Sequence, residues 1–265
     1  MSIERASKEK LPLPDAPSGD STPESRLAGE KNLQWPTVTA LICTLNEAPN
    51  LSLVLPQIPS QVDEVLLVDG HSTDGTVELA KELRPDIRVL YQEGRGKGVA
   101  LRYGVEQATG EIIVTLDADG ETDPEDMPRF IEPLLEGYDF VKGSRFATGW
   151  KKKPPHRLLG NFVIANTCNL LYGTRFTDLC SGYNAFWKNV LDRAYLWSED
   201  GWNYEPLMIA RVLRAGLKVL EVPQTYRGRA GEESKLGSWN QGLKSIRVLF
   251  RERFGSAARP TVKDG

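Results

Sequence analysis

From residue 36 onward, short apolar segments alternate with segments of helical periodicity. The apolar segments are rich in β-branched residues and lie at 38–43, 65–68, 87–90, 112–116 and 217–222. Short, continuously apolar strands that are separated by helices are typical of a parallel sheet covered on both faces. The pattern therefore predicts a single α/β domain with a mostly parallel central sheet and helices on both faces.

Helical periodicity is expected between these strands, at 51–55, 76–83 and 97–108. In the last of these segments Leu101 and Val105 recur at helical spacing, and Gly110 follows as a stop signal. In sheets of this kind, ligands collect beyond the carboxyl ends of the strands. The polar residues at those ends are therefore the candidates for chemistry.

The two ends of the chain depart from this alternation. Residues 1–35 are rich in Pro, Ser, Glu and Lys without an apolar period, which predicts a disordered tail before a domain at 36–236. Residues 237–265 predict an amphipathic helix followed by a tail. Its apolar face would carry Trp239, Leu243, Ile246, Phe250 and Phe254, flanked by Lys244, Arg247, Arg251 and Arg253. Such a helix either lies on an anionic bilayer or packs on the core. Likewise, the lysines at 151–153 either contact an anionic bilayer or are simply solvated.

Composition narrows the class of protein. With 26% charged residues and a net charge of -3, the chain lacks the basic excess of a general nucleic-acid binder. Its three cysteines, Cys43, Cys168 and Cys180, form no CxxC or Cys/His cluster, so we expect neither a disulfide framework nor a structural zinc site. A reducing cytosol is the expected compartment. No apolar run reaches the roughly 18 residues that span a bilayer. The predicted location is cytoplasmic, with peripheral contact at the inner face of the membrane as an addition.

A dense acidic stretch follows the strand at 112–116. Asp117 and Asp119 flank Ala118, so in an extended segment their side chains point the same way and can share one cation. Glu121 adds a third oxygen donor, and an all-oxygen set suits Mg²⁺ or Mn²⁺ rather than zinc. The carboxylates at 123–126 instead suit the positive end of the next helix.

Two other strand ends carry polar residues. Asp69 ends its strand, where its carboxylate can accept hydrogen bonds from a ribose or base, whereas Ser72 or Asp74 and the glycines after it suit turn and cap chemistry. The cluster Gly94-Arg95-Gly96-Lys97-Gly98 precedes a helix, so backbone amides and Lys97 can cradle an anion. The cluster fits neither a Walker A loop nor a dinucleotide fingerprint.

The order of these motifs is more specific than any one of them. The segments CTLNE, VDGHSTDGT, GRGKGVALRYG, DADGETDPED, KGSRF and TDLCSGYNAF together resemble glycosyltransferase family 2, which has the Rossmann-like GT-A fold. Within that family they are similar to the dolichyl-phosphate mannose synthase-like branch. The resemblance covers about residues 37–236.

The resemblance implies roles on the donor side. In that family an Asp-x-Asp motif holds a divalent cation that bridges the diphosphate of a nucleotide sugar. Asp117, Ala118 and Asp119 would be this motif, with Glu121 as a further ligand of Mg²⁺ or Mn²⁺. The resemblance also implies displacement at the anomeric carbon with inversion, assisted by the metal at the leaving diphosphate. The residues expected to face the nucleoside are Asp69, Thr44, Leu45, Asn46 and Glu47.

On the acceptor side, Arg145 of KGSRF matches the family's acceptor-side arginine. Further phosphate contacts are expected from Arg157, Arg229, Ser234 and Lys235. A polyprenyl phosphate acceptor is already ionised near pH 7 and needs no strong base. A hydroxyl acceptor would need one, and Asp178 of TDLCSG is the candidate, with a structural hydrogen bond in the turn as its alternative role.

The prediction is a metal-dependent inverting hexosyltransferase that moves mannose or glucose from a GDP- or UDP-sugar to a polyprenyl phosphate. A soluble hydroxyl acceptor is the second alternative. A sugar nucleotidyltransferase would need a glycine-rich basic loop directly after the first strand, where this chain has CTLNEAPN. A non-catalytic nucleotide-sugar-binding module would be expected to lose Asp117 or Asp119, and both are present.

Overall fold

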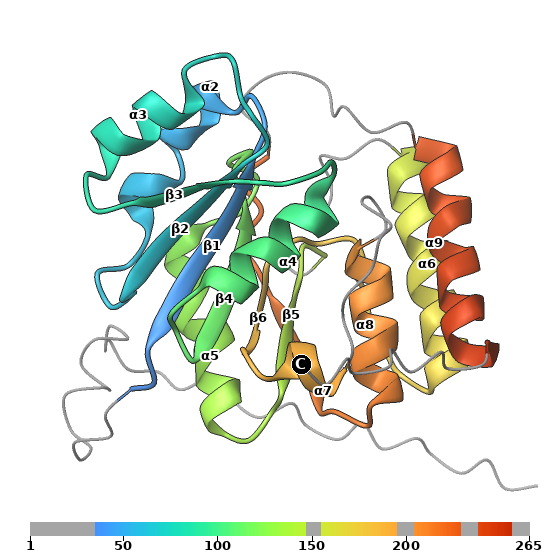
Figure 1. The fold of residues 1–265 in the computed structure, drawn as a ribbon. Helices are drawn as coiled ribbons and strands as arrows, with labels where there is room; N and C mark the ends of the chain where they lie inside the picture. The colour runs from blue at the N-terminus through green and yellow to red at the C-terminus, as the bar shows by residue number, and fades with distance from the viewer. Residues whose placement is uncertain (1–34, 147–154, 195–203, 229–237, 256–265) are drawn as a thin grey trace, which may run out of the picture. The chain divides into compact units, whose positions relative to one another are not determined.

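The computed structural model describes residues 35–146, 155–194, 204–228 and 238–255. They contain a seven-stranded sheet in the order β3-β2-β1-β4-β6-β5-β7 (Figure 1). Its strands are β1 Val38–Thr44, β2 Glu64–Asp69, β3 Arg88–Tyr91, β4 Ile112–Asp117, β5 Phe140–Ser144, β6 Asn184–Trp187 and β7 Val219–Pro223. Every neighbouring pair is parallel except the two that contain β6. The predicted α/β class with a mostly parallel sheet is confirmed.

Helices cover both faces of this sheet. Those on or beside it are α2 Ala48–Leu51, α3 Thr76–Leu83, α4 Lys97–Gln107, α5 Met127–Leu135, α7 Val190–Arg193 and α8 Tyr204–Arg214, with short 3-10 turns η1 Leu55–Gln57 and η2 Pro124–Asp126. In Figure 1, α4 crosses in front of the sheet and α5 lies behind it. Burial from two sides explains why β1 and β4 are almost continuously apolar.

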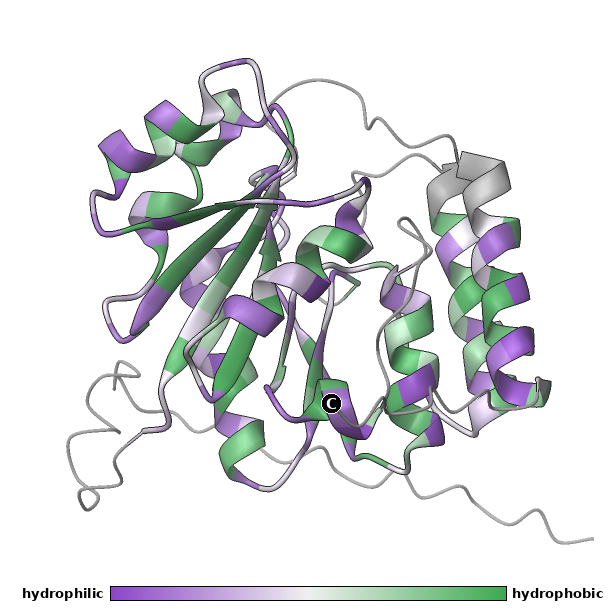
Figure 2. Ribbon diagram, viewed as in Figure 1, coloured by the Kyte–Doolittle hydropathy of each residue, from purple (hydrophilic) through white to green (hydrophobic). Residues whose placement is uncertain are grey.

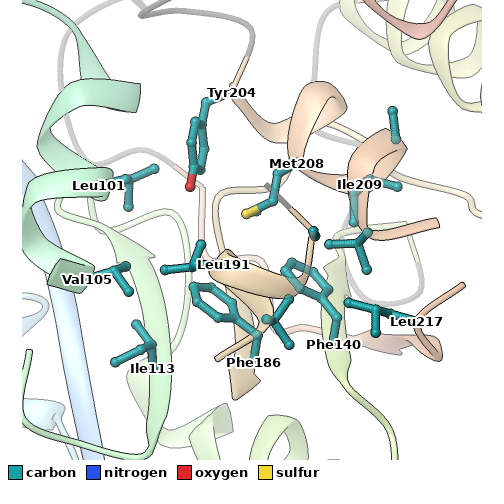
Figure 3. Packing of buried hydrophobic residues seen from close by; sticks show 14 of the residues in the cluster. Leu101, Val105, Ile113, Phe140, Phe186, Leu191, Tyr204, Met208, Ile209 and Leu217 are labelled. Carbon is teal, nitrogen blue, oxygen red and sulfur yellow. The ribbon is translucent and has the colours of Figure 1, made fainter. Parts of the chain in front are cut away.

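The larger core lies between the sheet and helices α4 and α8 (Figure 3). Leu101 and Val105 of α4 point into it, with Phe140 and Phe186 of the sheet and Met208 of α8. Helix α4 approaches the sheet closely at Gly104, where an added Cβ would lie 2.9 Å from Val68 Cγ2. The glycine therefore lets α4, and the loop before it, sit directly above the central strands.

Strands β5 and β6 were not predicted, because polar and small residues interrupt their apolar pattern. Lys142, Gly143 and Ser144 are three of the five residues of β5, and all three are buried. Asn184 opens β6 and is also buried. The predicted helix at 51–55 was wrong in position, since α2 begins at Ala48 and ends at Leu51. Helix α8 was missed as well.

Helices α6 Pro155–Tyr172 and α9 Ser238–Phe254 stand side by side at one edge of the fold (Figure 2). Their carboxyl-terminal ends are joined, because Tyr172 donates a hydrogen bond to Leu249 O at 3.2 Å and Arg253 Nε donates to Leu171 O at 2.8 Å. Buried Glu252 ties α9 to α8 through Arg211 and Arg214. Among the described residues, no helix is long and apolar enough to cross a membrane.

Candidate active site

The candidate residues gather at the carboxyl edge of the sheet because β1, β2 and β4 are parallel and adjacent. Thr44 at the end of β1 is the register partner of Asp69 at the end of β2. On the other side of β1, Cys43 is the partner of Asp117 at the end of β4. The fold therefore places both predicted halves of the donor site side by side.

Asp69 organises the two loops that leave β1 and β2. Its carboxylate accepts hydrogen bonds from Thr44 Oγ1 at 3.1 Å, from Ser72 N at 2.7 Å and from Ser72 Oγ at 2.5 Å. Asn46 continues the link. Its backbone N donates to Ser72 Oγ at 2.8 Å, and its side-chain Oδ1 accepts from Thr73 N at 2.8 Å. Asp69 is fully buried, and these contacts show that it shapes the turn after β2. Its predicted contact with the nucleoside stays a prediction.

The remaining residues predicted at the nucleoside end lie in the loop after β1. Leu45 and Asn46 are exposed, and Asn46 has a positive φ of 54°. The backbone N of Glu47 donates to Thr76 Oγ1 at 3.0 Å, and its carboxylate accepts from Asn50 Nδ2 at 2.8 Å. Side-chain contacts from helices α2 and α3 thus fix the loop that faces this end of the sheet.

Lys97 lies between two carboxylates. Its Nζ is 2.6 Å from Asp117 Oδ1 and 2.7 Å from Glu205 Oε1. Burial lowers the pKa of Lys97, but the charges of Asp117 and Glu205 outweigh burial and raise this pKa well above its ordinary value. Lys97 is therefore a permanent cation at the end of β4, and in this structure it neutralises protein carboxylates.

Two participants at this point were not predicted. Glu205 lies in the first turn of α8, 108 residues after Lys97 in the chain. Gly182 packs against the same ion pair, and a Cβ added there would lie 2.6 Å from Lys97 Nζ and 2.8 Å from Asp117 Cγ. Gly182 lies within the TDLCSGYNAF motif and Glu205 within none, and the contacts of both depend on how α8 and the loop before β6 return to the edge of β4.

The three carboxylates predicted as metal ligands contact different groups, and Asp117 is the one that meets Lys97. Asp119 Oδ1 accepts a hydrogen bond from Glu121 N at 3.1 Å, across Gly120 with its φ of 70°. Glu121 Oε2, however, faces Arg145 Nη1 at 3.9 Å. In the described part of the chain, no group of three or more His, Cys, Asp or Glu side chains is arranged to hold a metal. Glu121 is thus directed at the arginine, and its predicted role as a metal ligand stays a prediction.

Asp117 and Asp119 still fit a hard cation by chemistry. Both are carboxylates at one strand end, and Mg²⁺ is commonly bound by one or two carboxylates together with substrate phosphates and water. The later carboxylates have structural roles instead. Asp123 caps the 3-10 turn η2 by accepting from Glu125 N at 3.0 Å, and buried Asp126 accepts from Thr225 N at 2.5 Å. The predicted capping role is confirmed for Asp123, whereas Asp126 ties the start of α5 to the segment after β7.

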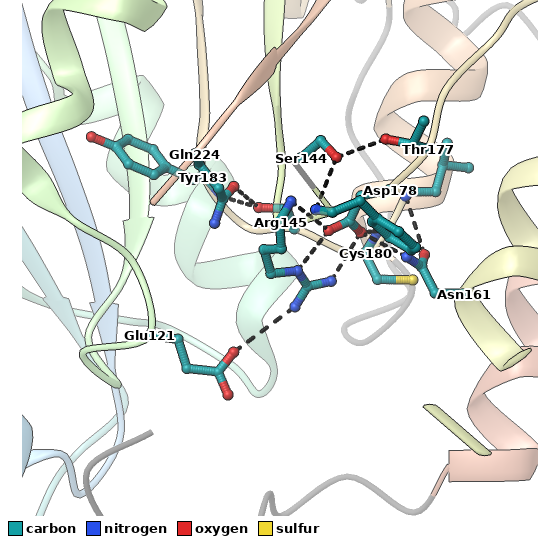
Figure 4. A network of polar contacts seen from close by, with 12 residues as sticks. Glu121, Ser144, Arg145, Asn161, Thr177, Asp178, Cys180, Tyr183 and Gln224 are labelled. Atoms are coloured by element: carbon teal, nitrogen blue, oxygen red, sulfur yellow. Dashed lines mark hydrogen bonds and ion pairs between the residues drawn. The ribbon is translucent and has the colours of Figure 1, made fainter. Parts of the chain in front are cut away.

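Arg145 and Asp178 form the centre of a polar network on the predicted acceptor side (Figure 4). Arg145 Nε donates to Asp178 Oδ2 at 2.6 Å and Nη2 donates to Oδ1 at 2.9 Å. Asn161 Nδ2 and Cys180 N donate to Asp178 Oδ1 at 3.1 Å and 2.9 Å. Burial raises the pKa of Asp178, but the charge and hydrogen bonds of Arg145, with the charge of Lys142, hold this pKa well below its usual range.

This arrangement argues against Asp178 as a general base. A base must be able to take a proton near the working pH, whereas the Asp178 carboxylate is fully buried, strongly acidic and already accepts several hydrogen bonds. The structural alternative, a carboxylate that fixes Arg145 and its own turn, is what the contacts support. Arg157, Arg229, Ser234 and Lys235 were also predicted on this side, and their side chains lie outside the described residues.

A buried lysine lies behind this network. Lys142 is fully buried in β5 and donates to Ser181 O at 3.2 Å, in the loop that also contains Gly182. Burial lowers the pKa of Lys142, partly opposed by the charge of Asp178. Lys142 therefore supports the loop between Asp178 and Gly182 from inside the sheet. The sequence offered no signal for it beyond its place in KGSRF.

Comparison with known proteins agrees with this architecture. A family model described as Glycosyl transferase family 2 matches residues 39–194. A dolichyl-phosphate hexose transferase of Haloferax volcanii is 33% identical over 79% of this chain and 92% of that protein. An undecaprenyl-phosphate mannosyltransferase of Micrococcus luteus is 32% identical over 84% of this chain and 95% of that protein.

A solved structure shares the fold. The crystal structure of glucosyl-3-phosphoglycerate synthase from Mycobacterium tuberculosis, in complex with Mn²⁺, UDP and glucosyl-3-phosphoglycerate, has a TM-score of 0.67 to this chain. It is 23% identical, with 82% of this chain and 80% of that chain covered. At this identity the likeness shows the GT-A fold, and function has to be argued from the site.

Proposed function

This chain belongs to glycosyl transferase family 2, and from that premise we propose that it moves a hexose from a nucleoside-diphosphate sugar to a polyprenyl phosphate. The hexose is mannose or glucose, and the anomeric configuration is inverted. Two relatives support the acceptor, since they are named for transfer to dolichyl phosphate and undecaprenyl phosphate and are matched over more than nine tenths of their length.

The observation that carries this proposal is the ion pair between Arg145 and Asp178. Because Asp178 is held as a carboxylate by Arg145, the acceptor side offers a phosphate-binding arginine and lacks a proton acceptor at this aspartate. A phosphate monoester loses its second proton near pH 6, so it is a ready nucleophile at neutral pH. A hydroxyl acceptor would need the base that Asp178 does not provide.

The reaction then needs no proton transfer. An oxygen of the polyprenyl phosphate forms a bond to the anomeric carbon, and the bond from that carbon to the donor diphosphate breaks. The nucleoside diphosphate leaves with the electron pair, and the products are a hexosyl phosphopolyprenol and GDP or UDP. Arg145 holds the attacking phosphate, and the edge formed by Lys97, Asp117 and Asp119 holds the leaving diphosphate.

Asp117 and Asp119 would hold the divalent cation, Mg²⁺ or Mn²⁺. When bound, the cation offsets the charge that develops on the leaving diphosphate. The two carboxylates fit it by ligand chemistry, with Asp117 ending β4 and Asp119 in the turn that follows. Glu121 stays next to Arg145, where its charge helps to fix the guanidinium.

Peripheral membrane contact is part of the same proposal, because a polyprenyl phosphate resides in a bilayer. Helices α6 and α9 each expose an apolar stripe at helical spacing. The exposed residues are Leu159, Phe162, Val163 and Leu170 on α6, and Leu243, Phe250 and Phe254 on α9. The basic residues Lys244, Arg247, Arg251 and Arg253 are also exposed on α9. Exposed apolar side chains beside basic ones suit an anionic lipid surface.

The test is a transfer assay with matched acceptors. Purified protein is given labelled GDP-mannose, GDP-glucose, UDP-mannose or UDP-glucose with Mg²⁺ or Mn²⁺. The acceptors are undecaprenyl phosphate, dolichyl phosphate, the corresponding free polyprenols and glycerol. We expect lipid-linked product with a polyprenyl phosphate only, and loss of that product in Arg145→Gln. Equal transfer to the free polyprenol or to glycerol would overturn the acceptor assignment.

A further inference from the structure

The contact of Lys97 with Asp117 conflicts with the proposed metal role of Asp117. An ammonium 2.6 Å from Asp117 Oδ1 occupies one of the two oxygens of the carboxylate that would hold a cation. A divalent cation on the same carboxylate would also repel Lys97 at short range. Lys97 and a divalent cation would therefore compete for Asp117 when the donor binds.

Glu205 is a second ion-pair partner of Lys97. Its Oε1 lies 2.7 Å from Lys97 Nζ, so the ammonium already has a second carboxylate partner and need not move far. The side chain of Glu205 is less exposed than that of Asp117, 15% against 35%, so Glu205 is the more enclosed of the two carboxylates. Gly182 closes the opposite side of the pair, since even a methyl group there would contact Lys97 Nζ.

We propose that Lys97 is the resident counter-ion of Asp117, and that Glu205 is a positioning residue that retains Lys97 when the divalent cation and the donor diphosphate take its place. This inference rests on the proposed function. After the exchange, Lys97 is shared between Glu205 and a diphosphate oxygen, whose negative charge replaces that of Asp117.

The exchange makes the cation and the nucleotide depend on each other. Without a nucleotide, the cation has to displace Lys97 from Asp117 with no anion to receive it, so cation binding is weak. With the diphosphate present, Lys97 gains a new partner and cation binding strengthens. The coupling is reciprocal, so the cation must strengthen nucleotide binding by the same factor.

The experiment measures Mn²⁺ binding directly, by the loss of the free-ion signal in electron paramagnetic resonance, without donor sugar and without turnover. Titrations are made with and without GDP or UDP for the wild type, Lys97→Met, Glu205→Gln and the double variant. We expect Lys97→Met to bind Mn²⁺ alone about tenfold more tightly and to lose most of the strengthening by nucleotide, in the usual range of such couplings.

Glu205→Gln separates a positioning role from plain charge. If Glu205 acts by retaining Lys97, this substitution should weaken Mn²⁺ binding about tenfold in the wild type and less than about threefold in the Lys97→Met background. Equal weakening in both backgrounds would show that Glu205 acts by its charge alone and would overturn the inference. So would Mn²⁺ binding that Lys97→Met leaves unchanged.

Two controls keep these outcomes interpretable. Lys81→Met removes an exposed lysine of α3, away from the edge of β4, and should leave Mn²⁺ binding unchanged. Thermal unfolding of each variant shows whether it folds. If the wild type binds no Mn²⁺ even with GDP or UDP, the proposed metal site fails together with this inference. If the wild type binds Mn²⁺ and Asp119→Ala abolishes binding, the proposed metal site stands. Lys97 variants that then bind Mn²⁺ like the wild type would overturn this inference alone.

Discussion

The guanidinium of Arg145 donates two hydrogen bonds to the carboxylate of Asp178, from Nε to Oδ2 at 2.6 Å and from Nη2 to Oδ1 at 2.9 Å. Such side-on pairs fix the orientation of both groups. The third nitrogen, Nη1, lies 3.9 Å from Glu121 Oε2, which is beyond hydrogen-bond distance. Nη1 is therefore the part of Arg145 that can meet an acceptor phosphate, and Asp178 determines where it points.

Arg145→Lys should separate acceptor binding from donor binding. Lysine keeps the charge but cannot make the two-nitrogen contact with Asp178, so the cation loses its fixed direction. We expect the KM for polyprenyl phosphate to rise about tenfold or more, a loss of roughly 1.4 kcal/mol per tenfold. The KM for the sugar nucleotide should stay within about twofold, and steady-state kinetics with each substrate varied in turn will show it.

Arg193→Lys is the matched control for that substitution. Arg193 also pairs with an aspartate, Asp139 at 2.7 Å, but it is half exposed and lies outside the candidate site. It should leave both KM values unchanged. If Arg145→Lys raised both KM values equally, its effect would lie in the fold rather than in the acceptor.

The depressed pKa of Asp178 predicts how stability depends on pH. Its folded-state pKa lies below the unfolded value of about 4, so its stabilising contribution is present above that value. The contribution is lost as pH falls through the unfolded pKa toward the folded one. Urea unfolding between pH 7 and pH 3 should show this loss. In Arg145→Gln the same slope should be shallower, and an identical slope would contradict the assignment.

Most of the sheet was predictable because burial on two faces demands continuous apolar segments. The strands at 38–43, 65–68 and 112–116 satisfy that demand with aliphatic residues. Strand β5 is not continuously apolar, because it contains the buried Lys142. The ammonium of Lys142 donates a hydrogen bond to Ser181 O, which makes its burial possible. A buried lysine that finds its partner in a loop 39 residues away cannot be told from a surface lysine by local pattern.

The same limit applies to the site. Which residues gather at the carboxyl edge follows from strand order, and Asp117, Asp119 and Lys97 were placed there from the sequence. Their pairing depends on long-range geometry. Glu205 reaches Lys97 only through α8, and Asp178 reaches Arg145 only through the loop that precedes β6. Sequence reasoning could name Lys97, Arg145 and Asp178 but not Glu205, and it could not assign the partners of any of them.

Gly182→Ala should damage nucleotide binding with little effect on the rest of the fold. An added Cβ would lie 2.6 Å from Lys97 Nζ and 2.8 Å from Asp117 Cγ, so the ion pair has to shift. We expect the affinity for GDP or UDP with Mn²⁺ to fall about tenfold or more, about 1.4 kcal/mol per tenfold. Isothermal titration calorimetry will measure this change.

Gly242→Ala supplies the comparison for Gly182→Ala. Gly242 lies in α9, and an added Cβ there meets nothing within 4 Å. Alanine in a helix is favoured over glycine by roughly 0.5–1 kcal/mol, so this variant should be slightly more stable and bind nucleotide normally. Equal nucleotide affinity in the two variants would show that the edge of β4 tolerates the methyl group.

Phe250→Glu and Phe254→Glu should weaken attachment to anionic vesicles. The two rings stack at 6.1 Å on the exposed side of α9, near the exposed Arg247 and Arg251. A carboxylate there removes apolar contact and repels anionic lipid, so the fraction that sediments with vesicles should fall several-fold at low salt. Leu135→Glu, at an exposed apolar position of α5, should sediment like the wild type. At low salt, both the apolar and the basic groups on α9 should interact with anionic vesicles. A wild-type protein that stays in the supernatant at low salt would therefore contradict the proposed membrane contact.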